Sequence, residues 1–343
     1  MKILVVKRDK VGDMLLTTPM LRRLREALPQ ASVDVLASDY NAWVLAGNPD
    51  VDSIWIYGRS RIGDRLSLKG AFQQAALAAR LRVEGYDVAI AAQGESSPRA
   101  TRRARWVGAR RTIAYVAPGE PRVSDALAPP ASGHERDRML ELLRPLGIAP
   151  PDVPRDPVFN PPEDMLAKAR SLLAARGLEA GRYVVIGLGA RRAKRQPDAG
   201  QVRRWSEWLH REHGLATVLM WTPGAAENPV YPGDDEVANA ILAGAPAWLH
   251  PFRGPLWPAV GIAWLARTSV FPDSGLMHLA AASPGGVLGL FAQPESSPPA
   301  SRWGPLGARA SWIEAPESVA RIGDEEFRAH LGQHLASLSE RRR

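Results

Sequence analysis

The chain has 343 residues, 45% of them hydrophobic and 23% charged, with a formal net charge of +8, which suits two domains rather than one core. Because it contains no cysteine, a disulfide framework, a thiolate nucleophile and a cysteine-ligated metal are excluded. The first apolar run is shorter than a signal peptide requires, and no stretch approaches the roughly 18 apolar residues of a membrane span. We therefore expect a soluble, cytoplasmic protein.

The first half of the chain predicts strands that alternate with helices. Short apolar, β-branched runs predict strands over 2–7, 32–38, 51–58, 87–94 and 111–116. Apolar spacings of three and four predict helices over 14–28, 72–86 and 134–148. Pro19 lies inside the first of these helices and should distort its first turns. Such alternation implies βαβ units and a parallel sheet.

A proline-rich segment then interrupts the pattern. Residues 149–164 hold six prolines and no periodicity, which is typical of an interdomain linker. After it, helices are predicted over 164–176, 199–213, 234–243 and 258–267, with a short one after 275. Strands are predicted over 182–190, 216–224, 247–252, 269–275 and 286–292.

The expected fold class is therefore α/β, with two doubly wound halves. We expect one domain over 1–155, a second over 165–315, and a C-terminal helix and tail over 316–343. In such folds, ligands bind beyond the carboxyl ends of the strands.

The positive charge is concentrated in one region. Residues 1–150 contain 23 Lys and Arg against 16 Asp and Glu, and the stretch 59–111 contains 12 against 4. This imbalance indicates an anionic partner for the first half. The alternative is a solvated, arginine-rich surface.

A glycine and an aspartate follow the first predicted strand. Gly12 would allow a tight turn into the helix, and Asp13 would stand at its start. Asp13 is either a plain helix N-cap or a catalytic base at the carboxyl edge of the sheet.

The second half places polar clusters at equivalent points. Asp273 ends a strand, and Ser274, Gly275 and Leu276 would begin a helix whose free N–H groups suit an anion, with His278 in reach. The alternative is a capping Asp and Ser beside a semi-buried histidine.

Two further loops carry polar groups. The loop 187–198 holds four cations, which either bind a pyrophosphate or form a solvated basic loop: Arg191, Arg192, Lys194 and Arg195. Glu227, after the next strand, is suited to accept hydrogen bonds from ribose hydroxyls.

These stretches resemble a known family. "VGDMLLTTPMLRRLREALPQASVDVLAS" resembles the start of glycosyltransferase family 9, the ADP-heptose–lipopolysaccharide heptosyltransferases, and "PDSGLMHLAAA" resembles its D-[ST]-G-x-x-H signature. "HERDRMLELLRPLGI" and "GARRAKRQP" also match, in register from about residue 1 to 310. Gln196 departs from the family, whose members commonly have an aromatic residue there, and this leaves the donor sugar open.

The resemblance implies a GT-B fold, with two Rossmann-like domains facing across a cleft. It implies an N-terminal acceptor-binding domain, a C-terminal nucleotide-sugar-binding domain, and an inverting transfer of heptose from ADP-heptose to the inner core of lipopolysaccharide, without a metal or other cofactor. The enzyme would be cytoplasmic and peripheral on the inner face of the inner membrane.

The resemblance also implies roles for single residues. Asp13 would be the base and Lys194 would contact the donor phosphates, while Glu227 would face the ribose and Gly254 the adenine. Asp273 would hold the donor sugar, and the pyrophosphate would lie on Ser274, Gly275, Leu276 and His278.

The basic stretch would bind the anionic acceptor. Its candidates are Arg59, Arg61, Arg65, Lys69, Arg99, Arg102 and Arg103. One alternative is a related transferase that uses another nucleotide sugar for capsule or O-chain. A nucleic-acid-binding protein is a further alternative, although 59–111 holds few aromatic residues for base stacking. A dinucleotide oxidoreductase is disfavoured, because no G-x-G-x-x-G follows the first strand.

Overall fold

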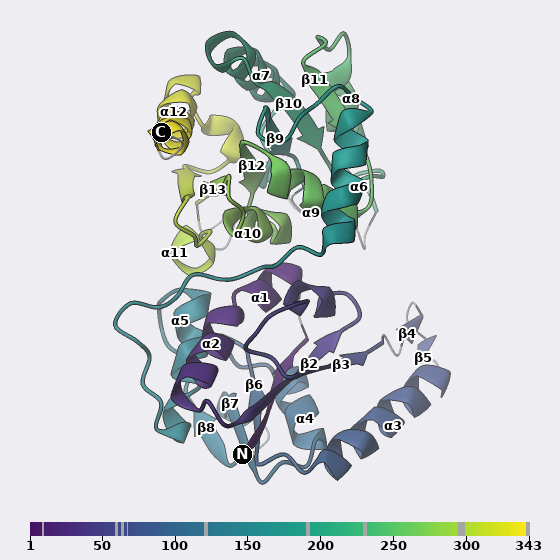
Figure 1. Cartoon of the computed structure of the whole chain (residues 1–343), viewed down its shortest axis with the longest axis vertical. Helices are drawn as coiled ribbons and strands as arrows, with labels where there is room; N and C mark the ends of the chain where they lie inside the picture. The colour runs from purple at the N-terminus through teal and green to yellow at the C-terminus, as the bar shows by residue number, and fades with distance from the viewer. Residues whose placement is uncertain are drawn as a thin grey trace. The chain divides into compact units, whose positions relative to one another are not determined.

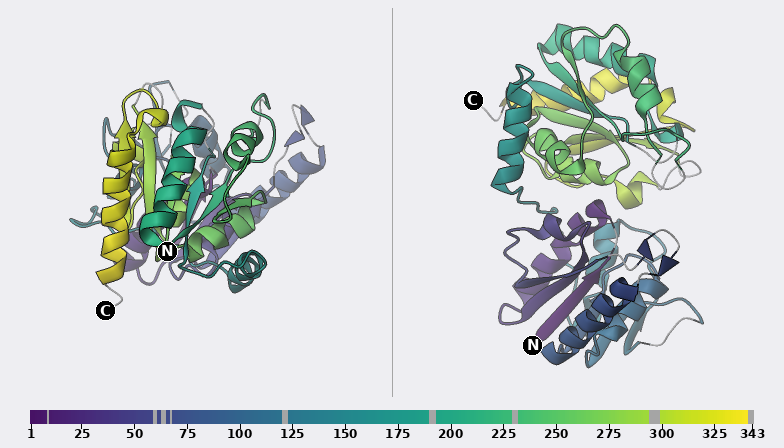
Figure 2. Two further views of the ribbon diagram at one scale, coloured as in Figure 1. Left: turned by 90° about the horizontal axis from the view of Figure 1, so that it is seen from above. Right: turned by 90° about the vertical axis from the view of Figure 1, so that its right-hand side faces the viewer.

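The chain forms two compact units in a computed structural model, Met1–Asn160 (unit 1) and Pro161–Arg343 (unit 2) (Figures 1 and 2). The boundary falls inside the proline-rich segment. The structure describes residues 1–8, 10–58, 61–62, 65–66, 68–119, 123–189, 193–228, 232–293 and 299–340.

Unit 1 is built on a six-stranded parallel sheet in the order β3-β2-β1-β6-β7-β8. Its strands are β1 (Lys2–Lys7), β2 (Ser32–Ser38), β3 (Ser53–Tyr57), β6 (Val88–Ala91), β7 (Arg111–Tyr115) and β8 (Asp125–Leu127). A short antiparallel ribbon joins β4 (Arg61–Ile62) to β5 (Arg65–Leu66). The central strands β1 and β6 are almost wholly buried, as a sheet covered on both faces requires.

Two of the helices predicted in unit 1 are interrupted at prolines. Pro19 divides the helix predicted over 14–28, because a proline is tolerated only in a first helical turn and here begins a new helix. The helix predicted over 134–148 stops before Pro145 for the same reason. The observed elements are α1 (Val11–Leu15), α2 (Thr18–Ala27), η1 (Ala42–Leu45), α3 (Leu68–Glu84), α4 (Pro98–Trp106), α5 (Glu135–Glu141) and η2 (Arg144–Leu146).

Unit 2 repeats the same design. Its parallel sheet has the order β11-β10-β9-β12-β13-β14. The strands are β9 (Tyr183–Gly187), β10 (Ala216–Met220), β11 (Leu249–Phe252), β12 (Thr268–Pro272), β13 (Val287–Ala292) and β14 (Ala310–Ala315). The helices are α6 (Glu163–Ala174), η3 (Ala193–Arg195), α7 (Ala199–His213), α8 (Asp235–Leu242), α9 (Leu256–Leu265), α10 (Gly275–Ala281), α11 (Ala300–Trp303), η4 (Val319–Arg321) and α12 (Asp324–Glu340).

Helix α12 belongs to the core of unit 2. Phe327 stacks on Trp205 of α7 with ring centroids 3.9 Å apart, and Leu331 and Leu335 are buried in the same cluster. The C-terminal segment is therefore held by apolar packing rather than by a cap or a salt bridge alone.

Each sheet reverses its strand order once, between β1 and β6 in unit 1 and between β9 and β12 in unit 2. This is the order of doubly wound dinucleotide-binding folds, whose ligand crevice lies beyond the carboxyl ends of the strands at the reversal. The prediction of two Rossmann-like halves is confirmed. Among the described residues, no helix is long and apolar enough to cross a membrane.

Candidate active site

The polar cluster of unit 2 begins where β12 ends. Asp273 follows Pro272, and Ser274 is the N-cap of α10, its Oγ accepting a hydrogen bond from Met277 N at 3.3 Å. The prediction that residues 274–276 begin a helix is confirmed. His278 lies within this helix and is only 5% exposed. Gly275 and Leu276 form its first turn.

An ion pair bridges the two strands of the reversal. Arg195, in the loop that follows β9, donates from Nη1 to Asp273 Oδ2 at 3.1 Å, and the two side chains are 13% and 14% exposed. Lys194 lies in the same turn, η3, with its side chain exposed. Arg191 and Arg192 lie outside the described residues. Arg195 therefore contacts the predicted sugar-binding aspartate.

The loop after β10 carries Glu227, which is exposed. This loop is closed at its base, because Gly233 N donates to Ala225 O at 2.9 Å. A Cβ on Gly233 would overlap the backbone of Gly224, so only glycine allows the two ends of the loop to approach so closely.

Two aspartates at the base of this loop were missed by the sequence analysis. Asp234 accepts from Thr222 N at 3.0 Å and from Gln196 Nε2, and thus ties the β9 loop to the β10 loop. Burial raises the pKa of Asp234, although these hydrogen bonds act in the opposite direction. Gln196, the departure from the family pattern, therefore has a structural partner.

Asp235 accepts from Trp221 Nε1 at 2.7 Å and from Gly224 N at 3.0 Å. Arg253, after β11, forms a bidentate pair with it at 3.1 Å. The Arg253 guanidinium, followed by the Trp221 hydrogen bond, holds the pKa of Asp235 well below its usual range. The Asp235 carboxylate thus connects the loop after β10, which carries Glu227, to the loop after β11, which carries Gly254.

Gly254 is half-buried beside the ring of Phe252. A Cβ at this position would lie 2.8 Å from that ring, so a larger residue would push the loop outward.

In unit 1, Asp13 is the third residue of α1 and is half-buried. The N-cap is Lys10, with no side-chain capping bond among the described residues, so the interpretation of Asp13 as a plain N-cap is wrong. The expected turn at Gly12 is also wrong, because the helix starts at Val11 and already includes Gly12.

The strand beside β1 ends in a buried polar group that the sequence analysis missed. Gln93 follows β6 and is 9% exposed, and its Nε2 has no hydrogen-bond partner among the residues that the structure describes. Next to it, Gly94 N donates to Glu135 Oε1 at 2.9 Å, and Arg138 donates to Gly94 O at 3.0 Å. A polar residue near the end of the apolar run predicted as a strand over 87–94 was the signal that could have found Gln93.

The predicted acceptor cations are only partly described. Arg103 lies 3.8 Å from the ring centroid of Tyr57 and donates to Gln74 Oε1 at 3.2 Å. Tyr57 OH donates to Arg8 O at 3.3 Å, and burial followed by the nearby cations Arg8 and Arg102 lowers the pKa of Arg103.

The structure therefore brings Arg8 and Arg103 together beside Tyr57, at the carboxyl end of β3. Of the other candidates, Lys69, Arg99 and Arg102 are exposed, while Arg59 and the side chains of Arg61 and Arg65 lie outside the described residues.

No group of three or more His, Cys, Asp or Glu that could hold a metal ion is found in the described part of the chain.

Comparisons with known proteins identify the family and the fold. Residues 74–322 match the profile of glycosyltransferase family 9 (heptosyltransferase). The chain is 28% identical over 301 residues to lipopolysaccharide heptosyltransferase 3 of Escherichia coli, covering 82% of this chain and 79% of that protein. It is 27% identical over 325 residues to lipopolysaccharide heptosyltransferase 2 of Salmonella typhimurium, covering 88% and 86%. The solved structure of E. coli ADP-heptose lps heptosyltransferase II superposes with a TM-score of 0.74 at 23% identity, over 98% of this chain and 99% of that one. The GT-B fold is confirmed by this last likeness.

Proposed function

Since the chain belongs to glycosyltransferase family 9, the heptosyltransferase family, we propose that it transfers heptose from ADP-heptose to the inner core of lipopolysaccharide. The enzyme class, glycosyltransferase, follows from the family. The names of the matched relatives support lipopolysaccharide as the acceptor and ADP-heptose as the donor.

The observation that carries the donor site is the Arg195–Asp273 ion pair beside the start of α10, at the strand reversal of unit 2. Unit 2 binds the nucleotide sugar in this proposal. Asp273 holds the sugar, Lys194 and the backbone of Ser274–Leu276 hold the diphosphate with His278, and Glu227 and Gly254 flank the nucleoside.

The proposed reaction inverts the anomeric centre without a metal. The acceptor hydroxyl attacks the anomeric carbon opposite the diphosphate, and Asp13 takes its proton. The new C–O bond forms as the bond to the diphosphate breaks, and ADP leaves with the electron pair. Asp13 lies in the first turn of α1, where the helix dipole favours its ionised form, so its contribution comes from position more than from basicity.

Unit 1 binds the anionic acceptor in this proposal. Arg8 and Arg103 supply described positive charge at the carboxyl edge, where Arg103 lies on the ring of Tyr57 and Tyr57 OH donates to Arg8 O. Gln93 offers an amide donor at the same edge. The enzyme then works at the inner face of the inner membrane, where such acceptors are assembled.

The test of the base is Asp13→Asn. We expect kcat to fall by about 10²–10⁴-fold, because the acceptor proton loses its recipient. Calorimetry with ADP should give the parent's affinity, since the nucleotide lies in unit 2. An Asp13→Asn enzyme with the parent's turnover would show that another group takes the proton.

The donor is tested with a panel of nucleotide sugars. Under the proposal, ADP-heptose alone turns over. Turnover of a different nucleotide sugar with ADP-heptose inert would instead support a related transferase of capsule or O-chain.

A further inference from the structure

Helix α3 has an outer apolar face that is exposed to solvent. Leu68, Phe72 and Val83 are 89%, 75% and 87% exposed, and Ala75 and Ala79 between them are exposed as well. Their spacing of three and four residues places them in one line along the helix, which we call the outer stripe.

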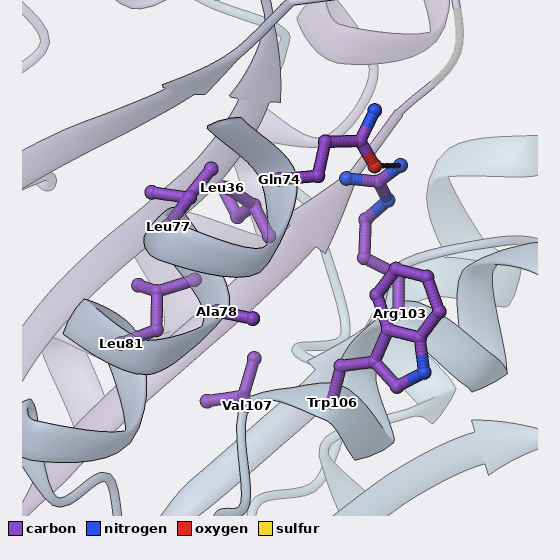
Figure 3. Close-up of a pocket in the computed structure, with 8 residues that line it drawn as sticks. All are labelled: Leu36, Gln74, Leu77, Ala78, Leu81, Arg103, Trp106 and Val107. Carbon is purple, nitrogen blue, oxygen red and sulfur yellow. Dashed lines mark hydrogen bonds between the residues drawn. The ribbon is translucent and has the colours of Figure 1, made fainter. Parts of the chain in front are cut away.

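The opposite face of α3 is occupied by the fold of unit 1. Figure 3 shows how this inner face and α4 line one pocket, with residues Leu36, Gln74, Leu77, Ala78, Leu81, Arg103, Trp106 and Val107. Leu81 is 2% exposed and belongs to the core of unit 1. The helix is therefore apolar on two faces, of which the fold of unit 1 covers one.

The surroundings of the outer stripe are positively charged. On α3, Lys69, Arg80 and Arg82 are exposed, and its single acidic residue, Glu84, is paired with Lys2 at 2.7 Å. A stripe of apolar side chains inside a cationic rim is the pattern of a helix that lies on an anionic membrane surface.

We propose that the outer stripe of α3 inserts into the interfacial region of an anionic lipid bilayer and docks unit 1 there. The inference deepens the proposed function and rests on it for the lipid-anchored acceptor. A second copy of the chain fits less well. In an antiparallel pair of α3 helices that centres the stripe, Lys69 would oppose Arg82, and like charges across an interface are destabilising.

The test is co-sedimentation of the full chain, without substrate, with vesicles of phosphatidylethanolamine and phosphatidylglycerol. Phe72→Ser/Val83→Ser should lower the partition coefficient by about tenfold or more, because two apolar side chains no longer enter the bilayer. Val83→Ser alone should lower it by about threefold. The matched control is Val153→Ser, the same substitution at a residue of unit 1 that is 82% exposed and lies outside α3, and it should bind as the parent does. Thermal unfolding should be unchanged in all three variants, since none of these side chains is buried.

Three results would overturn the inference. They are equal binding of the parent and the double variant, equal binding of the parent to phosphatidylcholine vesicles, and a lipid-free dimer that the double variant abolishes.

Failure of the inference and failure of the proposed function are separable. If the inference is right, the double variant retains transfer to a delipidated acceptor and loses transfer to the same acceptor in vesicles. Vesicle binding through the outer stripe without any heptose transfer would refute the proposed function and would still support the membrane-docking inference.

Discussion

The Arg195–Asp273 pair is the most informative side-chain contact of unit 2. Both side chains are largely shielded from water, and each follows a strand on one side of the reversal. Removing either partner of a shielded ion pair would leave the other charge unpaired in a place with little water, which is unfavourable. The two side chains are therefore held in contact. The pair therefore fixes Asp273 in the position proposed for sugar binding.

Arg195→Ala should lower the free energy of unfolding by about 2–4 kcal/mol and weaken ADP binding by at least about tenfold. Arg170→Ala is the control within unit 2, because its pair with Glu163 is exposed and should contribute at most about 1 kcal/mol. Urea unfolding and calorimetry measure both quantities. Equal, small effects of the two substitutions would contradict a structural role for the shielded pair.

Gln93 poses the opposite situation, a buried amide whose Nε2 has no partner in the described part of unit 1. Burying an amide donor without a hydrogen bond is unfavourable, so its presence at the carboxyl edge fits a substrate contact better than a packing role.

Gln93→Leu should therefore leave the free energy of unfolding unchanged or raise it by up to about 1 kcal/mol, while the KM for the acceptor rises and that for the donor does not. Gln201→Leu is the contrasting control. Gln201 is also buried, but its Nε2 donates to Val319 O and Ile322 O, and the loss should lower the stability by about 1–3 kcal/mol. Similar destabilisation in both variants would indicate that Gln93 is merely structural.

At the scale of elements, the loops rather than the strands define the candidate site. Asp234 and Asp235 stand side by side at the start of α8 and tie together three loops, those after β9, β10 and β11. The two ends of the loop that carries Glu227 are in contact, because the backbones of Gly224 and Gly233 lie against each other. Its shape depends on this contact, because nothing larger than glycine fits at Gly233.

Gly233→Ala should open the base of the loop and weaken ADP binding, with little effect on the fold of the sheet. Gly332→Ala is the matched control, because Gly332 lies in the middle of α12 and a Cβ there meets nothing within 4 Å. The higher helix propensity of alanine should stabilise the protein by about 1 kcal/mol. Calorimetry and thermal unfolding separate the two effects. Unaltered ADP affinity in Gly233→Ala would mean that the loop does not contact the nucleotide.

At the scale of the whole molecule, two units with their own cores repeat one topology. Helix α12 completes unit 2 through Phe327, Leu331 and Leu335, so the C-terminal segment is part of that unit's core. Each unit has the size and the buried core of an independent domain.

Residues 161–343, expressed alone, should therefore unfold cooperatively and bind ADP with an affinity within about tenfold of the full chain. They should show no transfer, because the proposed base is in unit 1. The same piece shortened to end at residue 323 lacks α12 and should not fold, which circular dichroism would show. If isolated unit 2 folded but did not bind ADP, the proposal that unit 2 holds the nucleotide would be wrong.

The sequence by itself determined the fold class. Buried parallel strands are continuous apolar runs, so β1, β2 and β9 were predicted closely. The predicted starts of α7 and α10 also agree with the observed N-caps, Asp198 and Ser274. Helix α4 escaped notice because it buries only small residues and its four arginines conceal the periodicity. Strand β14 escaped because its alternation at the sheet edge is weak.

Only the tertiary structure decided which polar groups meet. Local patterning specifies that Arg195, Asp273, Gln93 and Asp235 follow strands, but their partners are tens of residues away, and hydrogen bonds over such separations depend on strand order and loop path. The same holds for α3, whose two apolar faces look alike in the sequence. Packing against α4 buries one of them and leaves the outer stripe exposed. The spacing of the apolar residues along α3 does not specify which of its faces a neighbouring helix will cover.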